Sequence, residues 1–238
     1  MENKKGQGIF YGVIGVATLI VAIIGATFAY FSASQPGNGA SIGGNTNGDV
    51  AGNLSLEVSR LTFSAASAAS DDLVPAIMDT ENDDTTDLQR ALTAGCTNDG
   101  FTGCHVYKIT AEADANVTTA NLKLNLSVTA TDKDNWKYLV YSGSDTTSAG
   151  STSAATVTSI TTSATSLATD AEDVDIFRPA GGLTANTPIS WYLVVYLENI
   201  DAKQNGGTGA NDVDETGSYT GSVSLQAAGG QVKANFGA

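Results

Sequence analysis

The sequence predicts an all-β protein: a jelly-roll-like antiparallel β-sandwich preceded by an N-terminal apolar helix. Apolar residues make up 42% of the 238 residues and charged residues only 15%, a mixture that suits short strands better than long surface helices. Several segments after residue 53 alternate apolar and polar residues with the period of two that marks half-buried strands. Clusters of Gly, Ser, Asn and Asp separate these segments at the spacing of a sandwich or jelly roll.

Residues 1–34 are expected to be a signal peptide or a membrane anchor. Two lysines precede the uncharged apolar run 8–31, a pattern typical of an export signal or a membrane span with its N-terminus inside. Small residues permit cleavage after Ala29 or after Ser34. A cut after Gly6 is the alternative, and it would leave the apolar helix attached as the stalk of a pilin-type subunit.

Residues 35–52 differ from both of their neighbours because they are rich in Gly and Asn and contain almost nothing to bury. They are expected to form a flexible linker, or a segment that becomes ordered only on assembly. The remainder, 53–238, is long enough for one hydrophobic core and is interpreted as one β-sandwich domain.

Strands are expected wherever the alternation is clear. Segment 121–128 is the cleanest example, with Leu122, Leu124 and Leu126 on the inward face. Segment 189–197 is nearly all apolar and is therefore expected to be a central strand. The region 71–93 has room for one short helix, although its acidic residues are more typical of an exposed loop. The expected strands are 54–58, 106–111, 121–128, 136–141, 154–160, 189–197 and 218–226.

Cys96 and Cys104 are the only two cysteines, and they predict a structural disulfide. An Asn-Asp-Gly turn at 98–100 would fold the segment back on itself and bring the two sulfur atoms within bonding reach. In an exported protein a disulfide is the expected state of such a pair. A redox site would need a CxxC spacing, and a metal site would need further ligands.

The sequence gives little support for a catalytic site or a metal-binding site. His105 is the only histidine, so a zinc hydrolase of the HExxH type cannot be built. A Ser-His-Asp triad with His105 remains formally possible, but the sequence has no GxSxG elbow, and a satisfied or exposed loop histidine is the favoured interpretation. Acidic residues fall in turns rather than in strand interiors, which argues against paired catalytic carboxylates. No catalytic, cofactor-binding or metal-binding residue is assigned, and we expect a protein that is not an enzyme.

One segment resembles the start of a calcium loop. Asp212, Asp214, Thr216 and Gly217 match its opening, but Val223 stands where a bidentate Glu belongs. A hairpin turn before the last strands is the better interpretation.

Net charge restricts the partners. The chain has 11 Lys plus Arg against 25 Asp plus Glu, a formal net charge of −14. Nucleic acid is not an expected partner because binding phosphates requires clustered basic residues, and the acidity is interpreted as a source of solubility and repulsion between copies outside the cell. The aromatic residues of the strands are expected in the core and in cross-strand pairs, with a carbohydrate-stacking surface as the alternative. They are Tyr138, Tyr141, Trp191, Tyr192 and Tyr196.

Several blocks of sequence resemble a known group. The leader end ATFAYFSAS followed by AGNLSLEV is similar to the camelysin/TasA group of exported surface proteins of Gram-positive bacteria (Firmicutes). Blocks 96–107, 191–199 and 216–227 are similar to uncharacterised relatives with the same leader. The resemblance implies an exported jelly-roll sandwich and, for the TasA branch, extracellular fibres in which an N-terminal segment of one subunit completes the sheet of the next. The metalloprotease label sometimes attached to camelysin has no support in these residues, and the Gly-rich composition of 35–52 departs from the family.

The sequence therefore predicts a secreted or cell-surface structural protein, the subunit of a fibre or biofilm-matrix filament that self-associates by strand addition. The candidate donor strands are the mature N-terminal region up to Val58 and the C-terminal strand 231–236. The first alternative is a monomeric adhesin that binds glycan or host protein through loops 71–95 and 142–153. The second alternative is the pilin-type subunit, and in every version contact with the membrane occurs only through residues 8–31.

Overall fold

The computed structural model describes residues 53–63, 72–75, 85–98, 101–148, 151–200, 204, 214–227 and 230–237. The predicted leader with Ala29 and Ser34, and the segment 35–52, lie outside these residues. All described residues belong to one compact unit, Pro36–Ala238.

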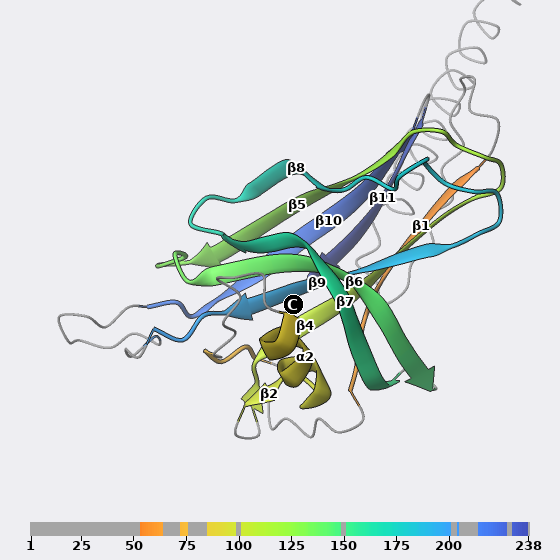
Figure 1. Ribbon diagram of the computed structural model, residues 1–238. Coiled ribbons are helices and arrows are strands. Elements are labelled where there is room, and N and C mark those ends of the chain that lie inside the picture. Colours follow the sequence, from red (N-terminus) through yellow and green to blue (C-terminus); the bar gives the residue numbers. More distant parts are fainter. Residues whose placement is uncertain are drawn as a thin grey trace, which may run out of the picture. The chain divides into compact units, whose positions relative to one another are not determined.

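Eleven strands and one short helix make up the described part (Figure 1). The pairings between strands are antiparallel. The elements are β1 (Leu54–Arg60), α2 (Thr85–Thr93), β2 (Thr97–Asn98), β3 (Phe101–Thr102), β4 (Cys104–Ala113), β5 (Ala120–Ala130), β6 (Trp136–Ser148), β7 (Ser151–Ser166), β8 (Ala171–Phe177), β9 (Ile189–Leu197), β10 (Gly217–Ala227) and β11 (Gly230–Gly237).

Two sheets account for most of these strands. The larger sheet has the order β1-β4-β9-β6-β7, and the smaller has the order β11-β10-β5-β8. From β4 to β10 the chain passes from one sheet to the other at each step, except at the hairpin β6–β7, and it ends in the hairpin β10–β11. The predicted all-β class is confirmed, and the arrangement is that of a β-sandwich.

The main core lies between the two sheets. It is formed by the apolar residues that alternate with polar ones in the sequence of the strands. Leu122, Leu124 and Leu126 of β5 are buried against residues such as Leu193 of β9 and Val223 of β10. The intervening residues of β5 are half-buried on the other face of the smaller sheet. Burying large aliphatic side chains in this way contributes about 1.5–3 kcal/mol for each side chain.

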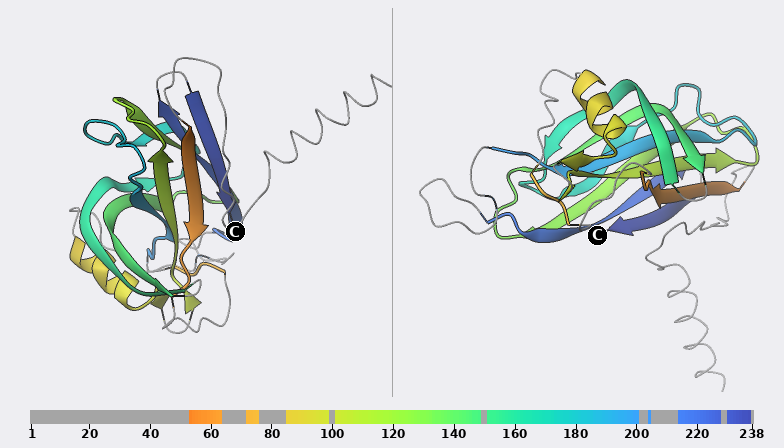
Figure 2. Two further views of the ribbon diagram at one scale, coloured as in Figure 1. Left: turned by 90° about the vertical axis from the view of Figure 1, so that its right-hand side faces the viewer. Right: turned by 90° about the horizontal axis from the view of Figure 1, so that it is seen from below.

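A second apolar cluster covers the opposite face of the larger sheet. Leu88 and Leu92 of α2 pack there with Tyr192 and Val194 of β9 and with Tyr141 of β6. Strand β9 is therefore buried on both faces, which explains why its sequence is nearly all apolar. Figure 2 shows α2 against the curved β6–β7 pair.

The helix α2, the hairpin β6–β7 and the strand β8 each bear on a prediction made from the sequence. The short helix within 71–93 is present as α2. The expected loop 142–153 is wrong, because its described residues, 142–148 and 151–153, belong to β6 and β7, two long strands that pair with each other. Strand β8 was not expected, because its sequence AEDVDIF is dominated by acidic residues and shows no regular alternation.

Candidate functional site: the edges of the two sheets

The four terminal strands of the sheets are the places where another chain could add. β1 and β7 end the larger sheet, and β8 and β11 end the smaller one. On one side of the sandwich β1 lies beside β11, and on the other β7 lies beside β8 (Figure 2). The outer edge of a terminal strand presents N–H and C=O groups that can pair with a new strand.

The edge of β7 is covered by a side chain of α2. Gln89 donates from Nε2 to the carbonyl oxygen of Ala155 at 2.7 Å, and its Oε1 accepts from the backbone N–H of Val157 at 2.8 Å. The amide of Gln89 thus pairs with β7 as the peptide group of a neighbouring strand would. Farther along β7, Thr162 donates from Oγ1 to the carbonyl oxygen of Ile176 in β8 at 3.0 Å.

The edge of β8 is irregular and acidic. Its pairing with β5 contains two register shifts, and Asp173 has a positive φ of 50°. Asp173 accepts from Asn125 Nδ2 and donates its own N–H to Asn125 Oδ1, both at 3.1 Å. The hydrogen bond from Asn121 and the nearby Arg178 lower the pKa of Asp175. Bulges and charged residues are common protection against strand addition. Acidic residues therefore do occur inside strands, contrary to the expectation that they occupy turns.

The edges of β1 and β11 are regular. Leu61 donates its backbone N–H to Val106 of β4, and Asn53 accepts from the N–H of Asp114, the residue after β4. Alternate residues of an antiparallel strand face the partner. Leu54, Leu56 and Val58 therefore turn their N–H and C=O groups away from β4. β1 pairs with β4, and β11 with β10, without a register shift. Within the described residues neither strand has a sheet partner on its other side.

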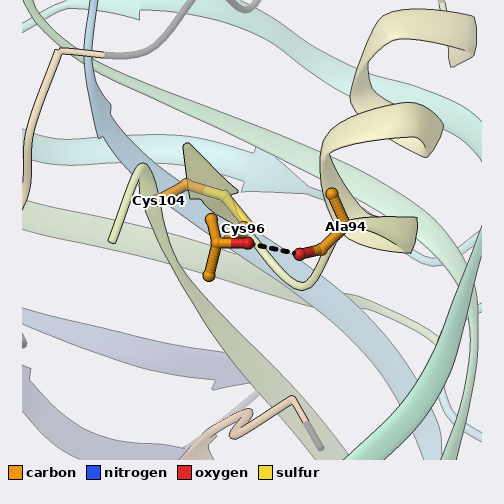
Figure 3. Close-up of a disulfide and its surroundings, with 4 residues drawn as sticks. Ala94, Cys96 and Cys104 are labelled. Carbon is orange, nitrogen blue, oxygen red and sulfur yellow. Dashed lines mark hydrogen bonds between the residues drawn. A yellow bond between two sulfur atoms is a disulfide. The ribbon is translucent and has the colours of Figure 1, made fainter. Parts of the chain in front are cut away.

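The predicted disulfide joins Cys96 to Cys104, with Cα atoms 5.1 Å apart (Figure 3). The chain reaches it directly from α2, which ends in a Schellman motif: Gly95 (φ 70°) donates to the carbonyl of Leu92, and Cys96 (φ 55°) donates to that of Ala91. β2 and β3 then pair back on each other. Residues 99 and 100 of the predicted turn lie outside the described residues.

His105 lies in β4, not in a loop, and its side chain is buried. Nδ1 is 2.6 Å from the hydroxyl of Tyr219, which is 2.7 Å from the hydroxyl of Tyr107. Tyr107 in turn lies 3.3 Å from the carbonyl oxygen of Gly237, to which it donates. The histidine is thus satisfied, as expected, and its hydrogen-bonded chain links β4 to β10 and β11.

The five aromatic residues considered for carbohydrate stacking are all buried. Tyr141 and Tyr192 are cross-strand partners whose rings stack with centroids 4.9 Å apart. The prediction of core positions and cross-strand pairs is confirmed, so these residues do not form a surface for a sugar.

The segment that resembles a calcium loop is described from Asp214 onward, directly before β10. The predicted hairpin turn is wrong, because the strands on either side, β9 and β10, belong to different sheets. Asp214 accepts from the N–H and from the hydroxyl of Thr216 at 3.3 and 2.5 Å, and its own N–H donates to Asp132. The next residue, Glu215, is buried and accepts from Asn135 and Gln204. Asp212 lies outside the described residues, within which no three His, Cys, Asp or Glu side chains lie close enough together to hold a metal ion.

A polar cluster that sequence reasoning missed lies on the outer face of the larger sheet. Lys108 of β4 forms an ion pair with Asp145 of β6, and Tyr192 of β9 donates to the same carboxylate. Burial, with the nearby Asp145, raises the pKa values of Tyr192 and Tyr141 above that of free tyrosine. No sequence signal links these residues, because Asp145 stands in a Ser- and Thr-rich stretch far from Lys108.

Within the residues that the structure describes, no helix combines the length and the apolar character needed to cross a membrane. The predicted span 8–31 lies outside them. No protein-family model matches the chain, and no curated protein matches it.

Proposed function

We propose that the chain is an exported subunit of a surface fibre or matrix filament, in which a segment of one copy adds to the β1–β11 side of the next. The observation that carries this proposal is the contrast between the two sides of the sandwich. The β7–β8 side is protected, whereas β1 and β11 are regular edge strands. The proposed role is structural, and its chemistry is backbone pairing.

The N-terminal segment 35–52 is the proposed donor. The other candidate, 231–236, already pairs with β10, and its release would expose Val232, Ala234 and Phe236, which are buried. Residues 54–58 are likewise paired with β4. The segment 35–52 directly precedes β1, but its Gly-rich composition offers few side chains to fill pockets. Its affinity would therefore come mainly from backbone hydrogen bonds and from high local concentration.

Three further features support the proposal. The disulfide fits an oxidising space outside the cell, and the apolar run 8–31 fits export or anchoring. The passage of the chain from sheet to sheet supports a jelly-roll-like sandwich, the fold implied by the resemblance to the camelysin/TasA group.

Two recombinant proteins test the proposal, one starting at Gln35 and one at Asn53. We expect the longer protein to form filaments by electron microscopy, and the shorter one to remain a folded monomer by light scattering. A synthetic peptide of residues 35–52 should bind the shorter protein, with a scrambled peptide of the same composition as the control. Filaments of unchanged yield from the shorter protein would exclude the N-terminal donor.

The mass of the native N-terminus separates the remaining versions. A chain that begins at Tyr30 or Gln35 has lost the apolar helix, and a chain that begins at Gln7 keeps it as a pilin-type stalk. If the longer protein is a stable monomer and binds to a glycan array, the fibre proposal is replaced by the alternative of a monomeric adhesin.

A further inference from the structure

The cluster of Lys108, Asp145 and Tyr192 joins three strands across the outer face of the larger sheet. Lys108 lies on β4, Tyr192 opposite it on β9, and Asp145 on β6 beyond its pairing with β9. Gly143 lies at a register shift, where any side chain would collide with the carbonyl of Thr156. β6 curves in this region (Figure 2), and Asp145 reaches over the sheet to Lys108.

The Asp145 carboxylate is held by one oxygen only. Oδ1 is 2.9 Å from Lys108 Nζ and also accepts from the Tyr192 hydroxyl. Oδ2 is buried and has no hydrogen-bond partner among the described residues. The Asp145 side chain is only 2% exposed and that of Lys108 is 28% exposed. A buried carboxylate with an unsatisfied oxygen is costly, even when it is paired with a cation.

Two tyrosine side chains line the site beside the ion pair. Tyr192 and the Tyr141 ring stacked on it provide an apolar wall. Their raised pKa values keep both phenols neutral at physiological pH, so neither adds a charge beside Asp145. Transfer of one proton from the ammonium to the carboxylate within the pair gives an amine beside a carboxylic acid, without a net change in protons.

We propose that Lys108 and Asp145 condense spontaneously in the folded protein to form an intramolecular amide bond. The Nζ lone pair attacks Cγ of the protonated carboxyl group, while the Tyr192 hydroxyl hydrogen-bonds the developing negative charge on Oδ1. The C–Oδ2 bond breaks, and Oδ2 leaves as water with the two protons that nitrogen gives up relative to the ammonium. Atoms and charge balance, no oxidant or cofactor is needed, and the oxygen that leaves is Oδ2, which no described residue holds.

A second ion pair shows why distance alone is not sufficient. Lys133 Nζ and Asp170 Oδ1 are also 2.9 Å apart. However, the Asp170 side chain is 34% exposed, and it accepts further hydrogen bonds from Ser127 and Val128. Both of its oxygens are held and its ionised form is stabilised, as its lowered pKa shows. We therefore expect Lys133 to remain a free amine.

The amide would tie β4 to β6 across β9 and so close the second apolar cluster covalently. It does not depend on strand addition, because it forms within one chain. A chain linked in this way resists mechanical extension and proteolysis better than one held by an ion pair, because the strands cannot separate without breaking a covalent bond.

Intact mass spectrometry of the whole purified protein tests the proposal. We expect a mass lower, by one water, than that calculated with the disulfide, and a tryptic species that joins the peptides of Lys108 and Asp145. Lys108→Arg and Asp145→Ala should each restore the calculated mass, whereas the matched control Lys133→Arg should keep the loss of water. Tyr192→Phe should leave a larger unlinked fraction.

The native chain alone decides the outcome, whether or not every variant folds. If fully folded protein still shows the calculated mass after prolonged incubation, the proposal is overturned. A loss of water that maps to another pair of residues overturns it equally.

Discussion

Removing the disulfide gives the most direct measure of what holds α2 and the second apolar cluster in place. The double variant Cys96→Ala/Cys104→Ala removes the bond without adding a polar group to a buried position, since both cysteines are buried. The two residues are eight apart in sequence. For a loop of about eight residues, the chain-entropy relation gives about 8 cal/mol/K, or about 2.5 kcal/mol at 25 °C.

The assay is urea unfolding followed by the fluorescence of Trp136 and Trp191, which are both buried. We expect the double variant to lose about 2.5 kcal/mol of unfolding free energy, and at a domain of this size about 5–10 °C in Tm. Reducing the native protein should cause a similar loss, which serves as the control. Hydrogen exchange should increase most in α2, because its C-terminal end runs directly into Cys96.

If the double variant and the reduced protein each lose less than about 0.5 kcal/mol of unfolding free energy, the reasoning is refuted. Such a result would mean that the loop between the two cysteines is equally restricted in the unfolded chain when the disulfide is absent. If the variant loses about 2.5 kcal/mol of unfolding free energy but the reduced native protein loses none, the cause is lost packing in the second apolar cluster and not the missing bond.

Three further predictions follow from individual side chains. Gln89→Ala removes both hydrogen bonds to β7 and should lower the free energy of unfolding in urea by about 1–2 kcal/mol. Because the variant also uncovers the edge of β7, it should increase self-association measured by light scattering. Unchanged association would show that other groups protect this edge. Leu193→Ala, at a fully buried position of β9, should cost about 2–5 kcal/mol, and a loss below about 1 kcal/mol would contradict the central position of β9. The hydrogen bonds from Ser127 and Lys133 lower the pKa of Asp170 below that of an ordinary aspartate, so its stabilisation is present above the unfolded pKa and is lost as the pH falls through the folded pKa. Tm should decrease over that interval, less steeply in Asp170→Asn, and equal slopes would contradict the assignment.

The predicted strands were located well wherever one face of a strand is apolar. β5 and β9 could be read from the sequence because Leu122, Leu124 and Leu126 alternate, and because β9 is buried on both faces. β8 could not be read from the sequence, because it is an edge strand whose pairing with β5 is irregular. A bulge at Asp173 and the hydrogen bonds of Asp173 with Asn125 interrupt the regular ladder, so the sequence shows no period of two.

The extended β6–β7 hairpin was missed for a related reason. Residues 142–153 are mainly Ser, Thr and Gly, a composition typical of loops. In the structure this part of β6 has no pairing with β9, and α2 lies against β7. Its two strands pair with each other, and the long-range contacts from Asp145 to Lys108 and from Gln89 to Ala155 join the hairpin to the rest of the fold. Contacts between residues so far apart leave no local pattern in the sequence.

The helix α2 connects the packing of the protein to its proposed assembly. Leu88 and Leu92 close the second apolar cluster, while Gln89, on the same helix, occupies the edge of β7. Any chain that folds well enough to bury these two leucines therefore also blocks this edge. If strand addition occurs, the acceptor edge is therefore β1 or β11. The proposed donor segment, 35–52, is a different surface of the molecule from this acceptor edge. Contacts of this heterologous kind do not end in a closed dimer; they continue from copy to copy and produce a filament unless the rotation happens to close a ring. The asymmetry of edge protection is thus compatible with the proposed linear polymer, and opening β7 with Gln89→Ala should add branched or lateral contacts to such a polymer.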